Sequence, residues 1–249
     1  IVTFSDSTKK RGCVYSNRVY EHTYKNNIFC NARADGDFAA GIHERSSVTT
    51  SVFTLINNTF DNILGSSFGR CFMIDLMKTY GHNIKNNTIK NCPSGGALFQ
   101  IRFLKVDEES FTIDSFNFIS NSVDDSLNYY YQISPQVLVL EQSESANFYD
   151  RNMLIFSNCY FENNYNPHKG GAICYGNSRF TAYTTTHFYR CKFVGNHAKE
   201  GGGAISIQLY DGCLIEECDF INNRADEDGS SSIYIQTVFK CKNSNFNGD

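Results

Sequence analysis

The sequence predicts an all-β protein, a right-handed parallel β-helix of about eight coils. Three observations favour this fold. Two short motifs recur in fixed phase along the chain, the runs between them alternate with a period of two, and the composition is rich in turn formers. Of the 249 residues, 27 are Asn and only 3 are Pro. Because Asn is a poor helix former that tolerates tight turns, a helical bundle is disfavoured.

The first motif is Phe-x-x-Asn, whose first residue we call the anchor. Four segments carry it in full: Phe118 to Asn121, Phe161 to Asn164, Phe193 to Asn196 and Phe220 to Asn223. Looser copies have Asn at the second position after the anchor (Phe29/Asn31, Phe60/Asn62 and Ile89/Asn91), and the last copy, Phe246 to Asp249, ends in Asp. The eight anchors are 31, 29, 29, 43, 32, 27 and 26 residues apart. A unit of this length holds three short strands and three turns, which is one coil of a β-helix.

The second motif is Gly-Gly-Ala followed by an aliphatic residue. Its copies are Gly95 to Leu98, Gly170 to Ile173 and Gly202 to Ile205, with degenerate versions at Ala40 to Ile42 and Ser231 to Ile233. In the two best copies the Ile lies 12 residues after the anchor (173 − 161 and 205 − 193). The small residues suit a tight corner that leads into an inward Ile.

The residues before each anchor form two further columns. Two positions before the anchor the chain has Asn27, Asn58, Asn87, Phe116, Cys159, Cys191, Cys218 and Ser244. Three positions before it the residues are Asn26, Asn57, Asn86, Ser115, Asn158, Arg190, Glu217 and Asn243. Strand alternation predicts that the first column faces inward as a ladder of Asn and then Cys, and that the second, entirely polar column faces water.

The paired motifs resemble the repeats of the polymorphic outer membrane proteins of chlamydiae, and those of related β-helix surface proteins of some protists, trichomonads among them. The resemblance is sharp from about Phe118 to Ile233 and loose before Ile89. It implies a surface-exposed passenger region tied to adhesion.

We expect one β-helix domain over residues 1–249, excised from a longer chain because the last motif is cut short. Residues 1–24 fit the repeat poorly and are predicted to be a cap or a degenerate coil. The spacing of 43 residues after Phe118 predicts an inserted loop over residues 124–151. Inserted loops of repeat proteins often bind partners, so Tyr129, Tyr130 and Tyr131 are candidate contact residues. The alternative is that the insert covers the core, since the run from Val137 to Leu140 is apolar.

Two N-glycosylation sequons lie one coil apart, at Asn57-Asn58-Thr59 and Asn86-Asn87-Thr88. Both acceptor residues fall in the column predicted to face water, which a glycan requires. An Asn-rich chain also produces such tripeptides by chance. The sequons therefore predict glycosylation of Asn57 and Asn86 on condition that the chain is secreted.

The chain has ten cysteines. Cys159, Cys191 and Cys218 share one inward column, where stacked Cα atoms about 4.8 Å apart are within reach of a vertical disulfide. Buried free Cys is also common as a small apolar residue. We expect a mixture of a few disulfides and buried thiols, with no zinc-ligand spacing.

Parallel β-helices also serve polysaccharide lyases and hydrolases, which align carboxylates on adjacent coils. Candidates here are Asp107, Glu108, Glu109, Asp124 and Asp125, with Arg102 nearby, but no other coil repeats them in phase. We therefore expect no catalytic, metal or cofactor site.

The favoured function is a non-enzymatic extracellular or cell-surface rod, structural or adhesin-like. Its expected partners are other protein chains, copies of itself, or host and cell-surface glycans. A net charge of −4 disfavours nucleic acid. A carbohydrate-active enzyme and an intracellular scaffold are the alternatives.

Overall fold

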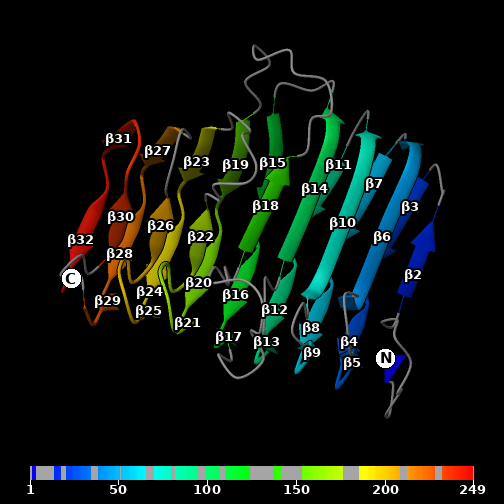
Figure 1. Cartoon of the computed structure of the whole chain (residues 1–249), viewed down its shortest axis with the longest axis horizontal. Helices are drawn as coiled ribbons and strands as arrows, with labels where there is room; N and C mark the ends of the chain where they lie inside the picture. The colour runs from blue at the N-terminus through cyan, green and yellow to red at the C-terminus, as the bar shows by residue number, and fades with distance from the viewer. Residues whose placement is uncertain are drawn as a thin grey trace.

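The protein is an all-β parallel β-solenoid, and its strands stack side by side with the two termini at opposite ends of the stack (Figure 1). The computed structural model describes residues 2–3, 14–17, 21–34, 39–50, 52–65, 70–79, 82–94, 99–106, 110–123, 137–141, 153–175, 185–207, 212–227 and 232–248. Every strand pair in these segments is parallel, and paired residues in successive turns lie one repeat apart in the chain, for example Phe161 opposite Phe193. The four turns anchored by Phe161, Phe193, Phe220 and Phe246 are the most completely described.

The anchors occupy the middle of one sheet of short strands. Its order is β1 (Val2–Thr3), β4 (Ile28–Cys30), β8 (Thr59–Asp61), β12 (Thr88–Lys90), β16 (Asn117–Ile119), β20 (Tyr160–Glu162), β24 (Lys192–Val194), β28 (Asp219–Ile221) and β32 (Asn245–Asn247). The strands that precede the anchors form a second sheet. Its order is β3 (Glu21–Lys25), β7 (Val52–Ile56), β11 (His82–Lys85), β15 (Ser110–Asp114), β19 (Met153–Ser157), β23 (Thr185–Tyr189), β27 (Gly212–Glu216) and β31 (Phe239–Lys242).

The third side of the solenoid is divided between two sheets. The N-terminal one has the order β18 (Val137–Glu141), β14 (Phe99–Val106), β10 (Arg70–Thr79), β6 (Ala39–Thr50) and β2 (Val14–Asn17), and the C-terminal one β22 (Ile173–Tyr175), β26 (Ile205–Ile207) and β30 (Ile233–Ile235). Short strands link the anchors to this side. They are β13 (Pro93–Ser94), β17 (Ser122–Val123), β21 (Tyr165–Asn166), β25 (His197–Ala198) and β29 (Arg224–Ala225) in one sheet, and β5 (Arg33–Ala34) and β9 (Leu64–Gly65) in another.

A single left-handed residue turns the chain on each side of every anchor strand. Fourteen non-glycine residues in the described segments have positive φ, between 50° and 59°, and all lie either three positions before an anchor or two positions after one. Gly195 and Gly248 take the second position in two turns, with φ of 60° and 70°. Asn tolerates this conformation better than most residues. The polar column predicted to face water is therefore the corner itself, and its members are exposed except for half-buried Ser115.

The residue after most corners is buried inside the solenoid. In many turns its side chain accepts a hydrogen bond from the main-chain N–H of the equivalent residue one turn earlier, whereas Ala32, Ile63 and Phe116 are apolar at this position. The N–H of Asn121 donates to Oδ1 of Asn164 at 3.1 Å. Nδ2 of Asn121 donates to the same oxygen at 3.0 Å and to the carbonyl of Ile89 at 3.0 Å. The same three bonds recur one turn later from Asn164, and again from Asn196 to Asn223. These buried side chains thus join consecutive turns along the axis.

The other corner carries an equivalent ladder, as predicted. Asn27 and Asn58 each donate their main-chain N–H to the Oδ1 of the next turn's Asn, at 3.0 and 2.9 Å. In later turns the acceptor is sulfur or a hydroxyl. The N–H of Cys191 donates to Sγ of Cys218 at 3.3 Å, and that of Cys218 to Oγ of Ser244 at 3.1 Å. Asn, Cys and Ser are therefore alternative acceptors for one kind of inward N–H.

From Phe118 onward the anchors form an aromatic column that is buried except at Phe246, its exposed last member, and the buried members confirm the predicted core. The rings of Phe118, Phe161, Phe193, Phe220 and Phe246 stack face to face, with centroids 4.6 to 5.0 Å apart and interplanar angles of at most 5°. Each such pair contributes about 0.5–1.5 kcal/mol beyond its buried area. Phe156 and Phe188 form a second stack at 5.3 Å, which meets the anchor column edge to face.

The two glycines of the second motif have different roles. Gly170 has φ of 70°, a left-handed conformation that favours glycine. A Cβ on Gly171 would lie 2.1 Å from the carbonyl oxygen of Gly203 in the next turn. The motif therefore sets a close approach between turns, and it leads into Ile173 and Ile205, which are buried as predicted. The copy at residues 95–98 lies outside the described residues.

The looser copies do supply anchors, because Phe29, Phe60, Ile89 and Phe118 pair in register along one sheet, but their Asn residues (Asn31, Asn62 and Asn91) are not equivalent to the inward Asn of the full motif. These three residues are exposed and occupy the left-handed corner two positions after the anchor. The inward position three after the anchor is held in these turns by a different set of buried residues, Ala32, Ile63 and Cys92. The sequence spacing merged two columns that face opposite ways.

The long spacing after Phe118 arises from two insertions rather than one loop. Strand β18 lies within the predicted insert and pairs with β14, Val137 opposite Phe99 and Glu141 opposite Phe103. The first insertion precedes β18: Val137 lies 19 residues after its anchor, whereas its partner Phe99 lies 10 residues after the anchor of the preceding turn (137 − 118 and 99 − 89). The second follows β18: the chain takes 12 residues from Glu141 to Met153, but 7 residues between their partners in the preceding turn (153 − 141 and 110 − 103). At the N-terminus, β1 and β2 of residues 1–24 pair in register with β4 and β6.

We predict that replacing Asn196 with Leu lowers the free energy of unfolding by about 3 kcal/mol, because the N–H and Nδ2 of Asn164 lose their buried acceptor. The matched control is Asn163→Gly. Asn163 sits at the exposed corner next to the ladder with φ of 51°, where glycine fits, so its change should stay below about 1 kcal/mol. Urea denaturation followed by circular dichroism measures both. Equal losses would contradict the separation of corner and ladder.

Replacing Gly171 with Ala should destabilise the protein by about 2 kcal/mol or more, because the added methyl meets a main-chain oxygen that cannot move without parting two turns. Gly212→Ala is the matched control, since its Cβ would meet only the side chain of Thr185, at 3.0 Å. Thermal denaturation of the two variants should therefore separate clearly. A melting temperature of the first variant equal to that of the second would refute the predicted close contact.

Candidate functional site

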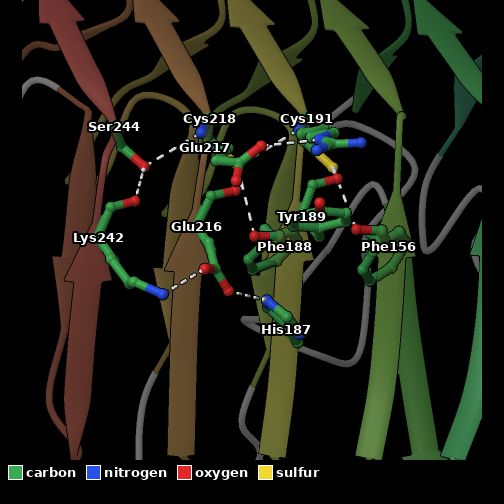
Figure 2. A network of polar contacts seen from close by, with 11 residues as sticks. Phe156, His187, Phe188, Tyr189, Cys191, Glu216, Glu217, Cys218, Lys242 and Ser244 are labelled. Atoms are coloured by element: carbon green, nitrogen blue, oxygen red, sulfur yellow. Dashed lines mark hydrogen bonds and ion pairs between the residues drawn. The ribbon is translucent and has the colours of Figure 1, made fainter.

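The most connected polar surface in the described residues lies on the outer face of β23, β27 and β31 (Figure 2). Glu216 is its centre. One carboxylate oxygen accepts a hydrogen bond from Nζ of Lys242 at 2.7 Å on the next strand. The other lies 3.7 Å from Nε2 of His187 on the preceding strand, an ion-pair distance rather than a hydrogen bond. Three successive turns are thereby linked across the sheet surface.

A second ion pair occupies the adjacent left-handed corner. Nε of Arg190 donates to Oε2 of Glu217 at 2.8 Å, in the column that other turns fill mainly with Asn. The guanidinium also lies over the ring of Tyr189, 4.6 Å from its centroid. Arg and Glu are less suited to positive φ than Asn. Their interaction across the turns offsets only part of that cost, because an exposed ion pair contributes little to stability.

These contacts shift the protonation equilibria of the network. The hydrogen bond from Lys242 lowers the pKa of Glu216, and the same contact raises the pKa of Lys242. The hydrogen bond with Glu217 raises the pKa of Arg190. His187 differs, because burial lowers its pKa and the charge of Glu216 only partly opposes this. At neutral pH the network therefore consists of two charged pairs beside a neutral imidazole.

A row of His–carboxylate contacts follows the loops between the anchor sheet and the third side. Nδ1 of His168 lies 2.9 Å from Oε1 of Glu200, and Nε2 of His197 lies 2.9 Å from Oδ2 of Asp226. In both cases the carboxylate belongs to the next turn. Nη2 of Arg224 lies 3.4 Å from Nδ1 of His197, so this imidazole sits between an anion and a cation. No group of three or more His, Cys, Asp or Glu side chains in the described residues is arranged to hold a metal ion.

The thiol column lies directly behind the first network (Figure 2). Sγ of Cys191 contacts the carbonyl of Phe156 at 3.3 Å, and Sγ of Cys218 that of Phe188 at 3.4 Å. Eight cysteines, those whose side chains the structure describes, are free thiols, and none of the expected disulfides is found among them. The thiols of the column contact carbonyls of the preceding turn as well as one another.

The structure describes some of the sequence-predicted site residues and not others. Asn57 and Asn86 are exposed corner residues with φ of 56°, and Nδ2 of Asn57 donates to Oδ1 of Asn26 at 3.2 Å. The candidate contact residues Tyr129, Tyr130 and Tyr131 lie outside the described residues, as do the acidic candidates Asp107, Glu108, Glu109, Asp124 and Asp125. The residues of the expected ladders are buried: Phe118, Phe161, Phe193, Phe220, Asn121, Asn164, Asn196, Asn223, Cys159, Cys191 and Cys218.

Sequence reasoning missed the contacts between turns that involve charged residues. Arg190 and Glu217 were recognised only as polar members of a column that faces water. Their opposite charges at equivalent positions of adjacent repeats were a usable signal, because equivalent residues of a solenoid stack. Glu216 and Lys242 carry the same signal one position earlier in the repeat.

Comparisons with known proteins give no further identification: no protein-family model, no curated protein and no solved structure matches this chain. In the segments described, no helix is long and apolar enough to cross a membrane. The geometry establishes a parallel β-solenoid repeat protein. The polar side chains described above form hydrogen bonds and ion pairs with residues of the neighbouring turns.

The thiols should differ sharply in reactivity in the native protein. Burial raises the pKa of Cys174 and of Cys213 to about 12, and raises the pKa of Cys191 as well. Since the thiolate is the nucleophile, we expect iodoacetamide at pH 8 to label exposed Cys241 at least 100-fold faster than these three. Mass spectrometry of timed digests measures the rates, and labelling in urea is the control. Similar labelling rates for all four thiols in the folded protein would contradict the burial of Cys174, Cys191 and Cys213.

Proposed function

We propose that this chain is a non-enzymatic structural or adhesin-like rod of the cell surface or extracellular space, built as a right-handed β-helix of eight coils. Other protein chains, copies of itself, or surface glycans are its proposed partners. The resemblance of its paired motifs to polymorphic outer membrane protein repeats supports this role. The axial ladders support it physically, because each buried polar column binds one turn to the next and makes an elongated scaffold.

The observation that carries the extracellular location is the placement of the two sequons. Asn57 and Asn86 occupy equivalent exposed corners of adjacent turns, 29 residues apart. Both side chains are exposed at a bend of the solenoid, the accessibility that a glycan requires, and Nδ2 of Asn57 would have to give up its hydrogen bond to Asn26. Glycans at both positions would form a regular row along one edge of the rod.

A second candidate, a scaffold in a reducing compartment, is favoured by a different observation. The eight cysteines whose side chains the structure describes are all free thiols, and most of them are buried. Free thiols persist where glutathione and thioredoxin keep cysteine reduced. The two candidates make opposite predictions for glycosylation, so one measurement on protein from its natural source separates them.

We predict a mass decrease on enzymatic N-deglycosylation of the native protein, assigned to Asn57 and Asn86 by the Asn-to-Asp conversion that the enzyme leaves. Asn26 is a built-in control. It occupies the same exposed corner, but its tripeptide Asn26-Asn27-Ile28 lacks the hydroxyl residue, so it should carry no glycan. Unmodified Asn57 and Asn86 together with ten free thiols would overturn the extracellular proposal and favour the scaffold.

A further inference from the structure

The ladder between β11 and β15 contains an imidazole where a main-chain acceptor is expected. Strand β11 pairs with β7 over all four of its residues, from His82 to Lys85. Its pairing with β15 begins only at Ile84, opposite Ile113. In a regular parallel ladder the N–H of Thr112 would donate to a carbonyl of the neighbouring strand. It donates instead to Nε2 of His82, at 2.8 Å.

This contact fixes the protonation state of the ring. Nε2 can accept the N–H of Thr112 only through its lone pair, so the imidazole must be neutral with its proton on Nδ1. A proton on Nε2 would set two donors against each other at hydrogen-bond distance. The contact and a charged His82 therefore exclude each other.

We propose that His82 is an acid-sensitive latch, whose neutral ring closes the seam between β11 and β15 and whose protonation opens the solenoid there. The latch depends on burial. Phe53, itself fully buried, is its partner on β7, and burial alone lowers the pKa of His82 to about 4. The ring thus stays neutral well below the pH at which a free histidine becomes charged.

Among the described residues, the titratable ones on the strands packed against the ring are Asp114 on β15 and Lys85 on its own strand, while β7 has none. The carboxylate of Asp114 accepts a hydrogen bond from Nδ2 of Asn158 at 2.9 Å, in the turn beyond β15. His22 lies in the same inward column, but on the far side of Phe53.

The direction of the pH effect follows from linkage. The unfolded chain takes up this proton near pH 6.5 and the folded chain only near pH 4, so the unfolded state binds more protons between these values. The stabilising contribution is complete above about pH 6.5 and is lost progressively as the pH falls to about 4. The loss of this contribution, as the pH falls from about 6.5 to about 4, should raise the unfolding equilibrium constant roughly 100- to 1,000-fold.

The test compares urea denaturation of the wild-type protein with His82→Gln at pH 7 and pH 4. Gln offers an acceptor oxygen but does not titrate. Between pH 7 and pH 4 the unfolding constant of the variant should therefore increase at least 100-fold less than that of the wild-type protein. His187→Gln is the matched control. Burial also lowers the pKa of His187, but no main-chain N–H of the described residues donates to Nε2 of its ring. An equal acid response in wild type and His82→Gln would overturn the latch.

A measurement on the wild-type protein keeps the proposal testable if the variant fails to fold. Hydrogen exchange of the peptide that contains Thr112, corrected for the intrinsic rate, should show protection at pH 7 that is lost toward pH 4. The peptide that contains Asn196, two turns farther along the rod, should keep its protection over the same range. Retained protection of Thr112 at pH 4, or an imidazole nitrogen signal of His82 that titrates near pH 6.5, would refute the proposal.

Discussion

The left-handed corner beside each anchor strand is the constraint on which the solenoid depends. A single residue at positive φ turns the chain, and the N–H of the residue that follows then needs an inward acceptor. The fold therefore favours a residue that tolerates this conformation at the corner and an Asn, Cys or Ser beside it, although Ala32, Ile63 and Phe116 take that inward position in individual turns. Seventeen of the 27 Asn residues occupy these positions, five at the first corner, five at the second and seven in the inward ladders. The composition of the chain is thus largely a consequence of its corners.

Periodic features of the fold were predictable from sequence, whereas contacts that occur once were not. The anchors, the inward column of Asn and Cys and the exposed column recur at one spacing, so stacking followed directly. The sequence pattern did not separate the exposed corner Asn from the buried ladder Asn. Asn62 lies two positions after its anchor and Asn164 three positions after its own, and both are the same residue type. His82 gave no signal at all. Its bond to Thr112 depends on where the pairing of two particular strands stops, and no period in the sequence records that.

The sequons illustrate how far a motif can be explained by the fold alone. In Asn57-Asn58-Thr59 the first residue takes the left-handed corner, the second accepts the N–H of Asn27 inside the solenoid, and the third begins a strand. Each residue type has a structural reason that involves no glycan. The tripeptide by itself is therefore weak evidence for a glycan. The exposure of the acceptor side chains of Asn57 and Asn86 on two adjacent turns carries more weight, because a glycan needs an accessible acceptor.

The free thiols are open to the same argument, and it weakens the case for a reducing compartment. Along one inward column Asn58 and Asn87 are followed by Cys159, Cys191 and Cys218, and then by Ser244. Sγ of Cys218 accepts an N–H as Oγ of Ser244 does one turn later, so sulfur serves here as a hydrogen-bond acceptor of suitable size. A cysteine retained for that purpose needs no redox partner, and burial protects it from oxidants. The thiol column is therefore explained by packing in either compartment, whereas an occupied sequon would be explained in only one.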